Sequence, residues 1–173
     1  MSKHTRRHRT RRGSTTTLPT ILIAAAVLAF GLLIYEAVRP RPGIAMPDLG
    51  NLHITYPQTA TYNSSPPTSG PHYTSLAPWG IHTEPIQNEL QVHNLEDGGV
   101  MVQYNCPDGC PELVDQLAEI VGRYDRFVIL APYPDMEARI ALTAWGRIDT
   151  LEAFNESRIV RFIETYRGID HHR

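Results

Sequence analysis

The clearest structural pattern in this 173-residue chain lies at residues 100–131, which read VMVQYNCPDGCPELVDQLAEIVGRYDRFVILA. Val100–Tyr104 is a short, mostly apolar run of the kind that forms a buried strand. Pro111–Tyr124 has apolar residues at helical spacing, and its proline suits the first turn of a helix. Phe127–Ala131 predicts a second buried strand. A strand, a helix and a strand in this order predict two parallel strands joined by a right-handed crossover.

Two segments further along the chain extend this unit. Ala138–Trp145 predicts a third strand, and Gly146 allows a turn into a fourth strand that runs through Thr150. Asn155–Tyr166 predicts a helix, because its apolar residues share one face and asparagine is a good N-cap. We therefore expect an α/β or α+β fold in which two helices pack on a small mixed sheet. This order of elements is compatible with a reduced thioredoxin-like fold.

The segment before these elements is rich in proline. Residues 39–71 contain seven of the 14 prolines in the chain. Each proline removes a backbone donor and restrains the residue before it, which excludes a long helix here. The predicted sheet is therefore preceded by extended loops.

The N-terminal segment has the pattern of a membrane anchor. Residues 18–35, LPTILIAAAVLAFGLLIY, carry no charge, and as a helix they would extend for roughly 27 Å, close to the thickness of a hydrocarbon core. A cleaved signal peptide is the alternative, but its apolar region is usually only about 7–15 residues long. Six basic residues and no acidic ones lie in residues 1–17, which orients the N-terminus towards the cytoplasm.

The sequence thus predicts a single-pass cell-membrane protein with its C-terminal domain outside the cytoplasm. The formal net charge of −2 combines the basic N-terminus with a remainder of 10 basic and 18 acidic residues. Topology and attraction to anionic lipid account for the basic tail, so the expected partners are the lipid bilayer and an envelope protein, and no nucleic acid. The predicted parts are a cytoplasmic tail (1–17), a transmembrane signal-anchor helix (18–38), a linker (39–54), an extracytoplasmic domain (55–168) and a tail (169–173).

Cys106 and Cys110 are the two cysteines of the chain, and both lie at the start of the first predicted helix of the domain. The positive end of a helix dipole stabilises a thiolate there. Three interpretations are open: a structural disulfide, natural outside the cytoplasm, a soft metal site for Cu(I), or a redox-active pair. The stretch from Asn105 to Leu113 resembles the Cys-Pro-Asp-x-Cys-Pro motif of membrane-anchored copper chaperones for cytochrome oxidase. That resemblance implies copper chemistry, although the distant histidine of those proteins has only His171 and His172 as counterparts here.

A second resemblance covers about residues 55–168. The segments that carry it are YNSSPPTSGPHY (62–73), Trp79-Gly80, VHNLEDGGV (92–100) and Thr143–Gly146. Together they closely resemble a bacterial domain-of-unknown-function family numbered 3105. The resemblance implies a shared domain without implying an activity. Asp97 stands where the pattern of that family has a second histidine.

Histidines in these segments are candidate metal ligands. His72 and His93 are flanked by glycine and proline turns and are expected on loops beside the first strand. With Asp97, Cys106 and Cys110 they form a plausible zinc or copper ligand set. Asp97 would act as a ligand or would orient His93. The alternative is that both imidazoles bond loop carbonyls. Two other histidines, His53 and His82, are expected at the surface, and Glu96 is expected as an acceptor in a loop or turn.

The sequence therefore favours a membrane-anchored extracytoplasmic protein that binds a transition metal, copper before zinc, for delivery or sequestration. The alternatives are a non-catalytic envelope interaction module held by a Cys106–Cys110 bridge and a thiol–disulfide oxidoreductase. No phosphate-binding loop, nucleophile elbow or helical His-Glu-x-x-His motif is present in the sequence. We therefore assign no catalytic residue and favour a non-enzymatic role, with the thiol–disulfide oxidoreductase kept open as an alternative.

Overall fold

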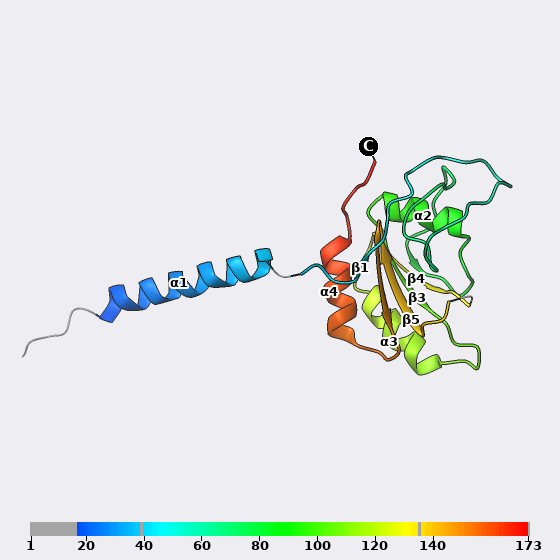
Figure 1. The fold of residues 1–173 in the computed structure, drawn as a ribbon. Coiled ribbons are helices and arrows are strands. Elements are labelled where there is room, and N and C mark those ends of the chain that lie inside the picture. The colour runs from blue at the N-terminus through cyan, green and yellow to red at the C-terminus, as the bar shows by residue number, and fades with distance from the viewer. Residues whose placement is uncertain (1–16, 39, 135, 173) are drawn as a thin grey trace, which may run out of the picture. The chain divides into compact units, whose positions relative to one another are not determined.

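The computed structural model describes residues 17–38, 40–134 and 136–172 (Figure 1). The chain divides into two compact units, Met1–Pro40 and Arg41–Arg173. Helix α1, Thr17–Val38, covers the segment predicted to cross the membrane. Within the described residues, however, no helix has both the length and the apolar character that crossing a bilayer requires. Apart from Thr17, the predicted cytoplasmic tail lies outside the described residues.

The second unit is built on a mixed sheet. Among the described residues, six strands pair in the order β1-β6-β5-β3-β4-β2. Their bounds are Ile44–Ala45 (β1), Gly80–Ile81 (β2), Val100–Tyr104 (β3), Val128–Pro132 (β4), Ile140–Ala144 (β5) and Arg147–Leu151 (β6). Strands β3 and β4 are parallel and are connected through α3, Pro111–Val121, whereas β5 pairs antiparallel with both β3 and β6. The predicted parallel pair, the hairpin and the mixed sheet are therefore confirmed.

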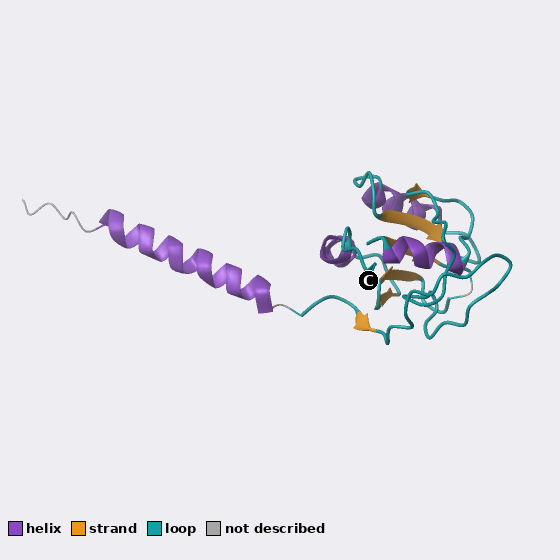
Figure 2. Ribbon diagram, turned by 90° about the horizontal axis from the view of Figure 1, so that it is seen from above, coloured by secondary structure: helices purple, strands orange, loops and turns teal. Residues whose placement is uncertain are grey.

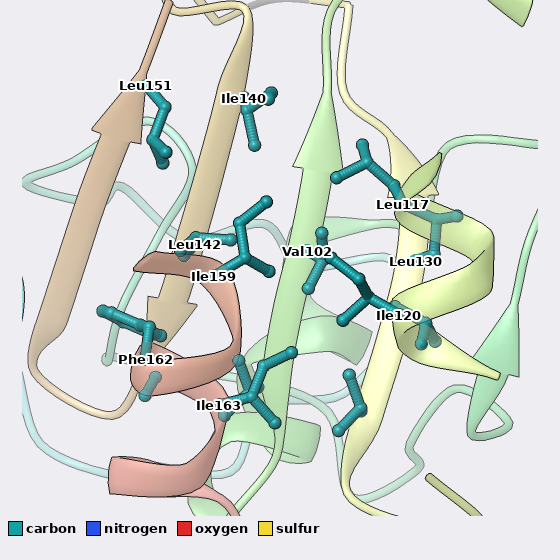
Figure 3. Packing of buried hydrophobic residues seen from close by; sticks show 14 of the residues in the cluster. Val102, Leu117, Ile120, Leu130, Ile140, Leu142, Leu151, Ile159, Phe162 and Ile163 are labelled. Atoms are coloured by element: carbon teal, nitrogen blue, oxygen red, sulfur yellow. The ribbon is translucent and has the colours of Figure 1, made fainter. Parts of the chain in front are cut away.

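Helices cover both faces of this sheet (Figure 1). On one face, α3 and α4, Glu156–Tyr166, pack against inward-facing strand residues such as Val102 and Leu142 (Figure 3). The predicted cap of α4 is confirmed, since the side chain of Asn155 accepts a hydrogen bond of 3.0 Å from the backbone of Arg158. Burial of these apolar side chains is the main favourable term in folding.

The opposite face carries α2, Asn88–Glu96, a helix that the sequence pattern did not reveal. Its contact with the sheet includes Leu95, which packs against Met101 and Ile129 in a smaller apolar cluster. The helix is buried on almost every side, and its buried residues are Glu89, Gln91, Val92, His93, Asn94, Leu95 and Glu96. Because polar and apolar residues are buried alike, α2 lacks the one-sided apolar pattern of a surface helix. The prediction that His93 lies on a loop is therefore wrong.

Long loops complete the outer side of α2. The chain between β1 and β2 is drawn almost wholly as loop in Figure 2, in agreement with its proline content. Within it, His53 and His72 form an isolated parallel bridge. Parts of the predicted linker and tail also belong to this unit: β1 pairs with β6, and the backbone N–H of His171 donates to the carbonyl of Glu96 at 2.8 Å. The loops and the C-terminal segment thus meet at the same end of α2.

Candidate metal centre

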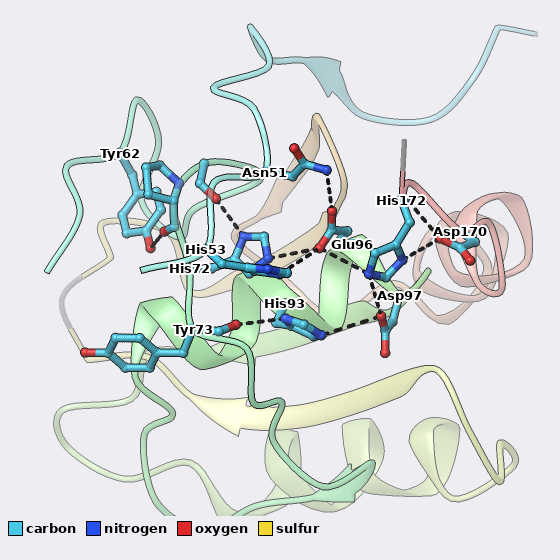
Figure 4. A network of polar contacts seen from close by, with 12 residues as sticks. Asn51, His53, Tyr62, His72, Tyr73, His93, Glu96, Asp97, Asp170 and His172 are labelled. Carbon is cyan, nitrogen blue, oxygen red and sulfur yellow. Dashed lines mark hydrogen bonds and ion pairs between the residues drawn. The ribbon is translucent and has the colours of Figure 1, made fainter. Parts of the chain in front are cut away.

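Four side chains converge at the C-terminal half of α2 (Figure 4). His53, His72, His93 and Glu96 each offer one ligand atom, and these atoms all lie within 4.8 Å of one another, so the group could hold a metal ion. Two of the residues come from α2 itself. The other two come from the Pro-rich loops, where the His53–His72 bridge brings two distant segments into register. His72 and Glu96 are fully buried, whereas the side chain of His53 is 45% exposed.

A second group adjoins the first and shares His93 with it. Asp97, the residue after the last turn of α2, and His172, near the C-terminus, complete this group. The Oδ1 atom of Asp97 lies 3.8 Å from Nε2 of His93 and 3.6 Å from Nε2 of His172. The side chain of His172 is 46% exposed, so the two groups form one cluster with a buried interior and an accessible rim.

The buried imidazoles are oriented by backbone carbonyls. Nδ1 of His72 lies 2.8 Å from the carbonyl oxygen of Gly70, and Nδ1 of His93 lies 2.8 Å from that of Tyr73. A carbonyl oxygen can only accept, so each Nδ1 carries the hydrogen and donates it. Each Nε2 is then left with its lone pair directed at the cluster. Metal-binding histidines in proteins are held in this way by a partner on the other ring nitrogen.

Glu96 is the central acceptor of the cluster. Its Oε1 atom accepts a hydrogen bond of 2.7 Å from Nδ2 of Asn51, and its Oε2 atom lies 2.9 Å from Nε2 of His72. Burial lowers the pKa of His72, and this outweighs the opposing effects of the hydrogen bond to Gly70 and the charge of Glu96. Neutral His72, with its hydrogen on Nδ1, therefore places one lone pair against another. Such a contact needs a proton or a metal cation between the two atoms.

The spacing of this contact is near that of two ligands on one metal ion. Zinc lies about 2.0–2.2 Å from imidazole nitrogen and carboxylate oxygen in a tetrahedral site, so neighbouring ligands on one ion are about 3.4 Å apart. The separation between Nε2 of His72 and Oε2 of Glu96 is 2.9 Å, somewhat shorter than this. The two atoms would therefore move slightly apart when an ion binds between them.

Comparison with known proteins adds the family. The family model described as "Protein of unknown function (DUF3105)" matches residues 53–172. This chain belongs to the DUF3105 family. No curated protein and no solved structure matches it, and the thioredoxin-like fold considered from the sequence has no support. The DUF3105 match starts at His53 and ends at His172, so all six side chains of the cluster lie within it.

The structure brings three of the five predicted ligands of this DUF3105 domain together. His72 and His93 share one group, and Asp97 joins His93 in the other. Cys106 and Cys110 are bonded to each other in a disulfide at the start of α3, and neither belongs to a group that could hold a metal among the described residues. The two cysteines therefore form the bridge that was one of the three interpretations of the sequence.

Three further side chains of the cluster were not predicted as ligands. Glu96 could have been found from its spacing, since positions 93, 96 and 97 share one face if the segment is helical. The spacing carries no such information for a loop, which is the structure that the flanking Gly residues indicate for this segment. His53 and His172 carry no local signal, because only the folding of distant segments places them beside α2. His82, also expected at the surface, hydrogen-bonds the carbonyl of Pro78 at 2.7 Å and belongs to neither group.

Proposed function

We propose that this DUF3105 domain binds a divalent transition-metal ion through His53, His72, His93 and Glu96. The observation that carries the proposal is the buried contact of 2.9 Å between Nε2 of His72 and Oε2 of Glu96. A metal ion between these two atoms would take the place of the proton that the contact otherwise needs, and would form a ligand bond to each of them. The nearby Nε2 atoms of His93 and His53 would supply the remaining protein ligands.

The donor atoms indicate which ions to expect. Imidazole and carboxylate suit Zn²⁺ and Cu²⁺, whereas Cu⁺ prefers the sulfur of cysteine or methionine. Cys106 and Cys110 are bonded to each other, and no cysteine in the described part of the chain is free. We therefore keep zinc and copper in the proposal, with copper as Cu²⁺ rather than Cu⁺.

The exposure of the ligands favours a site that can exchange its ion. His72 and Glu96 are buried and fixed, and His93 is 8% exposed, whereas the imidazole of His53 stands at the rim. An ion bound here would be held firmly from the side of α2 and reached by water or by another molecule from the side of His53. Delivery to a partner and sequestration both require such access.

The proposal includes a place at the cell membrane, outside the cytoplasm. The disulfide between Cys106 and Cys110 supports it, because disulfides persist mainly in oxidising compartments. The basic residues before the apolar segment 18–35 support the same topology. In this setting the apolar segment 18–35 would anchor the protein in the bilayer, and an envelope protein would be the partner in metal transfer.

Removal of His93 provides the first test of metal binding. In competition with a chelating indicator, the full-length chain should bind Zn²⁺, and His93→Ala should bind it at least about tenfold more weakly because a buried ligand is lost. His82→Ala is the matched control, since His82 belongs to neither group, and it should bind like the wild type. A wild-type chain that does not compete for zinc, or a His93→Ala chain with unchanged affinity, would refute the proposal.

A further inference from the structure

One ion at the first group leaves two well-placed ligands unused. Nε2 of His172 lies 3.6 Å from Oδ1 of Asp97 and 3.4 Å from Oε2 of Glu96. Figure 4 shows these side chains continuing the cluster on the side away from His53. The six ligand atoms nevertheless fall into two groups rather than one. Ligands of a single ion lie within about 4.4 Å of one another, because each is about 2.0–2.2 Å from the metal. The six atoms do not all lie within even 4.8 Å of one another, so they do not fit around one ion.

His93 belongs to both groups but can serve only one ion at a time. Its Nδ1 atom is taken by the carbonyl of Tyr73, so only Nε2 is left for a metal. If His93 joins the second group, both groups have the same composition. His53, His72 and Glu96 form one set, and His93, His172 and Asp97 form the other. Each set then has two imidazoles and one carboxylate, the triad that holds transition metals with open positions for water or substrate.

We propose that the centre binds two divalent transition-metal ions side by side, one in each of these sets. This inference rests on the proposed function and adds the second ion to it. Oε2 of Glu96 faces both sets, at 2.9 Å from His72 and 3.4 Å from His172, and is therefore placed to bridge the two ions. With one ion bound, Nε2 of His93 is the fourth ligand of that ion. With two ions bound, Nε2 of His93 binds the second ion instead of the first.

The C-terminal segment is held where this second site needs it. Nδ1 of His172 lies 2.7 Å from Oδ1 of Asp170, which orients the ring and leaves Nε2 for a metal. The backbone N–H of Gly168 donates to the carbonyl of Gly98 at 2.7 Å. Gly98 has a φ of +86°, and a Cβ atom there would meet the backbone of Ile169 at 2.7 Å, so only glycine permits this approach. The segment is thus fastened at the end of α2 beside Asp97.

Metal stoichiometry tests this inference on the full-length chain. Titration with Zn²⁺ should reach two equivalents for the wild type and for His82→Ala. His172→Ala should reach one equivalent, and so should Asp97→Asn, which removes the other half of the pair without shortening a side chain. His172 lies at the rim, so its replacement leaves the core intact. Loading the same chains with Cu²⁺ should give a spin-coupled electron paramagnetic resonance signal in the wild type and an isolated-ion signal in His172→Ala.

The outcomes separate this inference from the proposed function. One equivalent in the wild type would overturn the second site and leave the single site standing. Two equivalents that persist in both His172→Ala and Asp97→Asn would also overturn it, because the second ion would then lie elsewhere. No bound zinc in the wild type would overturn both.

Discussion

Replacing Glu96 by glutamine is expected to lower the affinity for Zn²⁺ about 100-fold, equivalent to about 2.7 kcal/mol, and to leave the metal-free fold intact. Glutamine can still accept the hydrogen bond from Asn51 through its oxygen. Its amide nitrogen would face Nε2 of His72 and donate to it, so the contact of 2.9 Å would be kept as a hydrogen bond that needs neither an added proton nor a metal ion. The charged ligand is lost, but the buried polar groups stay paired.

The matched control for this variant lies on the same helix. Glu89 is also buried in α2, accepts a hydrogen bond from the backbone of Ala60 and lies outside both ligand groups. Glu89→Gln should therefore bind zinc like the wild type. Isothermal titration of the three full-length chains, with urea unfolding of their metal-free forms, measures both effects. Equal zinc affinity in Glu96→Gln and the wild type would exclude Glu96 as a ligand.

Zinc should also stabilise the fold strongly. At a free concentration about 1,000 times the dissociation constant, an ion that binds only the folded state adds about 4 kcal/mol to the free energy of unfolding. For a unit of this size the melting temperature would rise by about 10 °C. The stabilisation is physically reasonable because the ion would join the loops that carry His53 and His72 to α2, segments held mainly by loop hydrogen bonds.

Thermal denaturation with and without zinc measures this effect, and a chelator should reverse it. His82→Ala should respond like the wild type, whereas Glu96→Gln should show little rise at the same zinc concentration. A wild-type melting temperature that zinc leaves unchanged under conditions where the metal is bound would show that the ion does not hold these segments together.

The parts of the fold that depend on local pattern could be predicted from the sequence. Strands β3 and β4 with α3 between them, the β5–β6 hairpin and the cap at Asn155 follow from apolar spacing, turn residues and capping chemistry. Each of these signals is contained in a few consecutive residues. The two-residue strands β1 and β2 could not be found in this way, because they form only by pairing with β6 and β4.

The residues of the candidate site likewise divide into those with a local sequence signal and those that only the folded chain brings together. His72 and His93 were predicted as ligands because they stand in unusual Gly- and Pro-flanked motifs. Helix α2 was missed, since nearly all of its side chains are buried and no apolar stripe remains to mark it. Glu96 was missed for the same reason, because its position beside the other ligands depends on helical spacing. His53 and His172 lie at opposite ends of the domain sequence, and only the folded chain brings them to one place.

The disulfide is one of the three states that the sequence predicts for Cys106 and Cys110. Cys106 and Cys110 are bonded and close the connection between β3 and α3, while the histidine cluster gathers around α2. A structural bridge and a separate metal centre can therefore coexist in one domain. In the proposed arrangement the sulfur atoms would stabilise the fold, and nitrogen and oxygen atoms would hold the metal.

X-ray absorption spectroscopy at the zinc edge of the loaded full-length chain would identify the atoms bound to the metal. We predict a first shell of nitrogen and oxygen at about 2.0–2.2 Å, with the outer-shell scattering of at least two imidazole rings. In His72→Ala the imidazole contribution should decrease, whereas in His82→Ala it should be unchanged. A first shell that contains sulfur at about 2.3 Å, or one without imidazole scattering, would contradict a metal centre built from the histidines and carboxylates around α2.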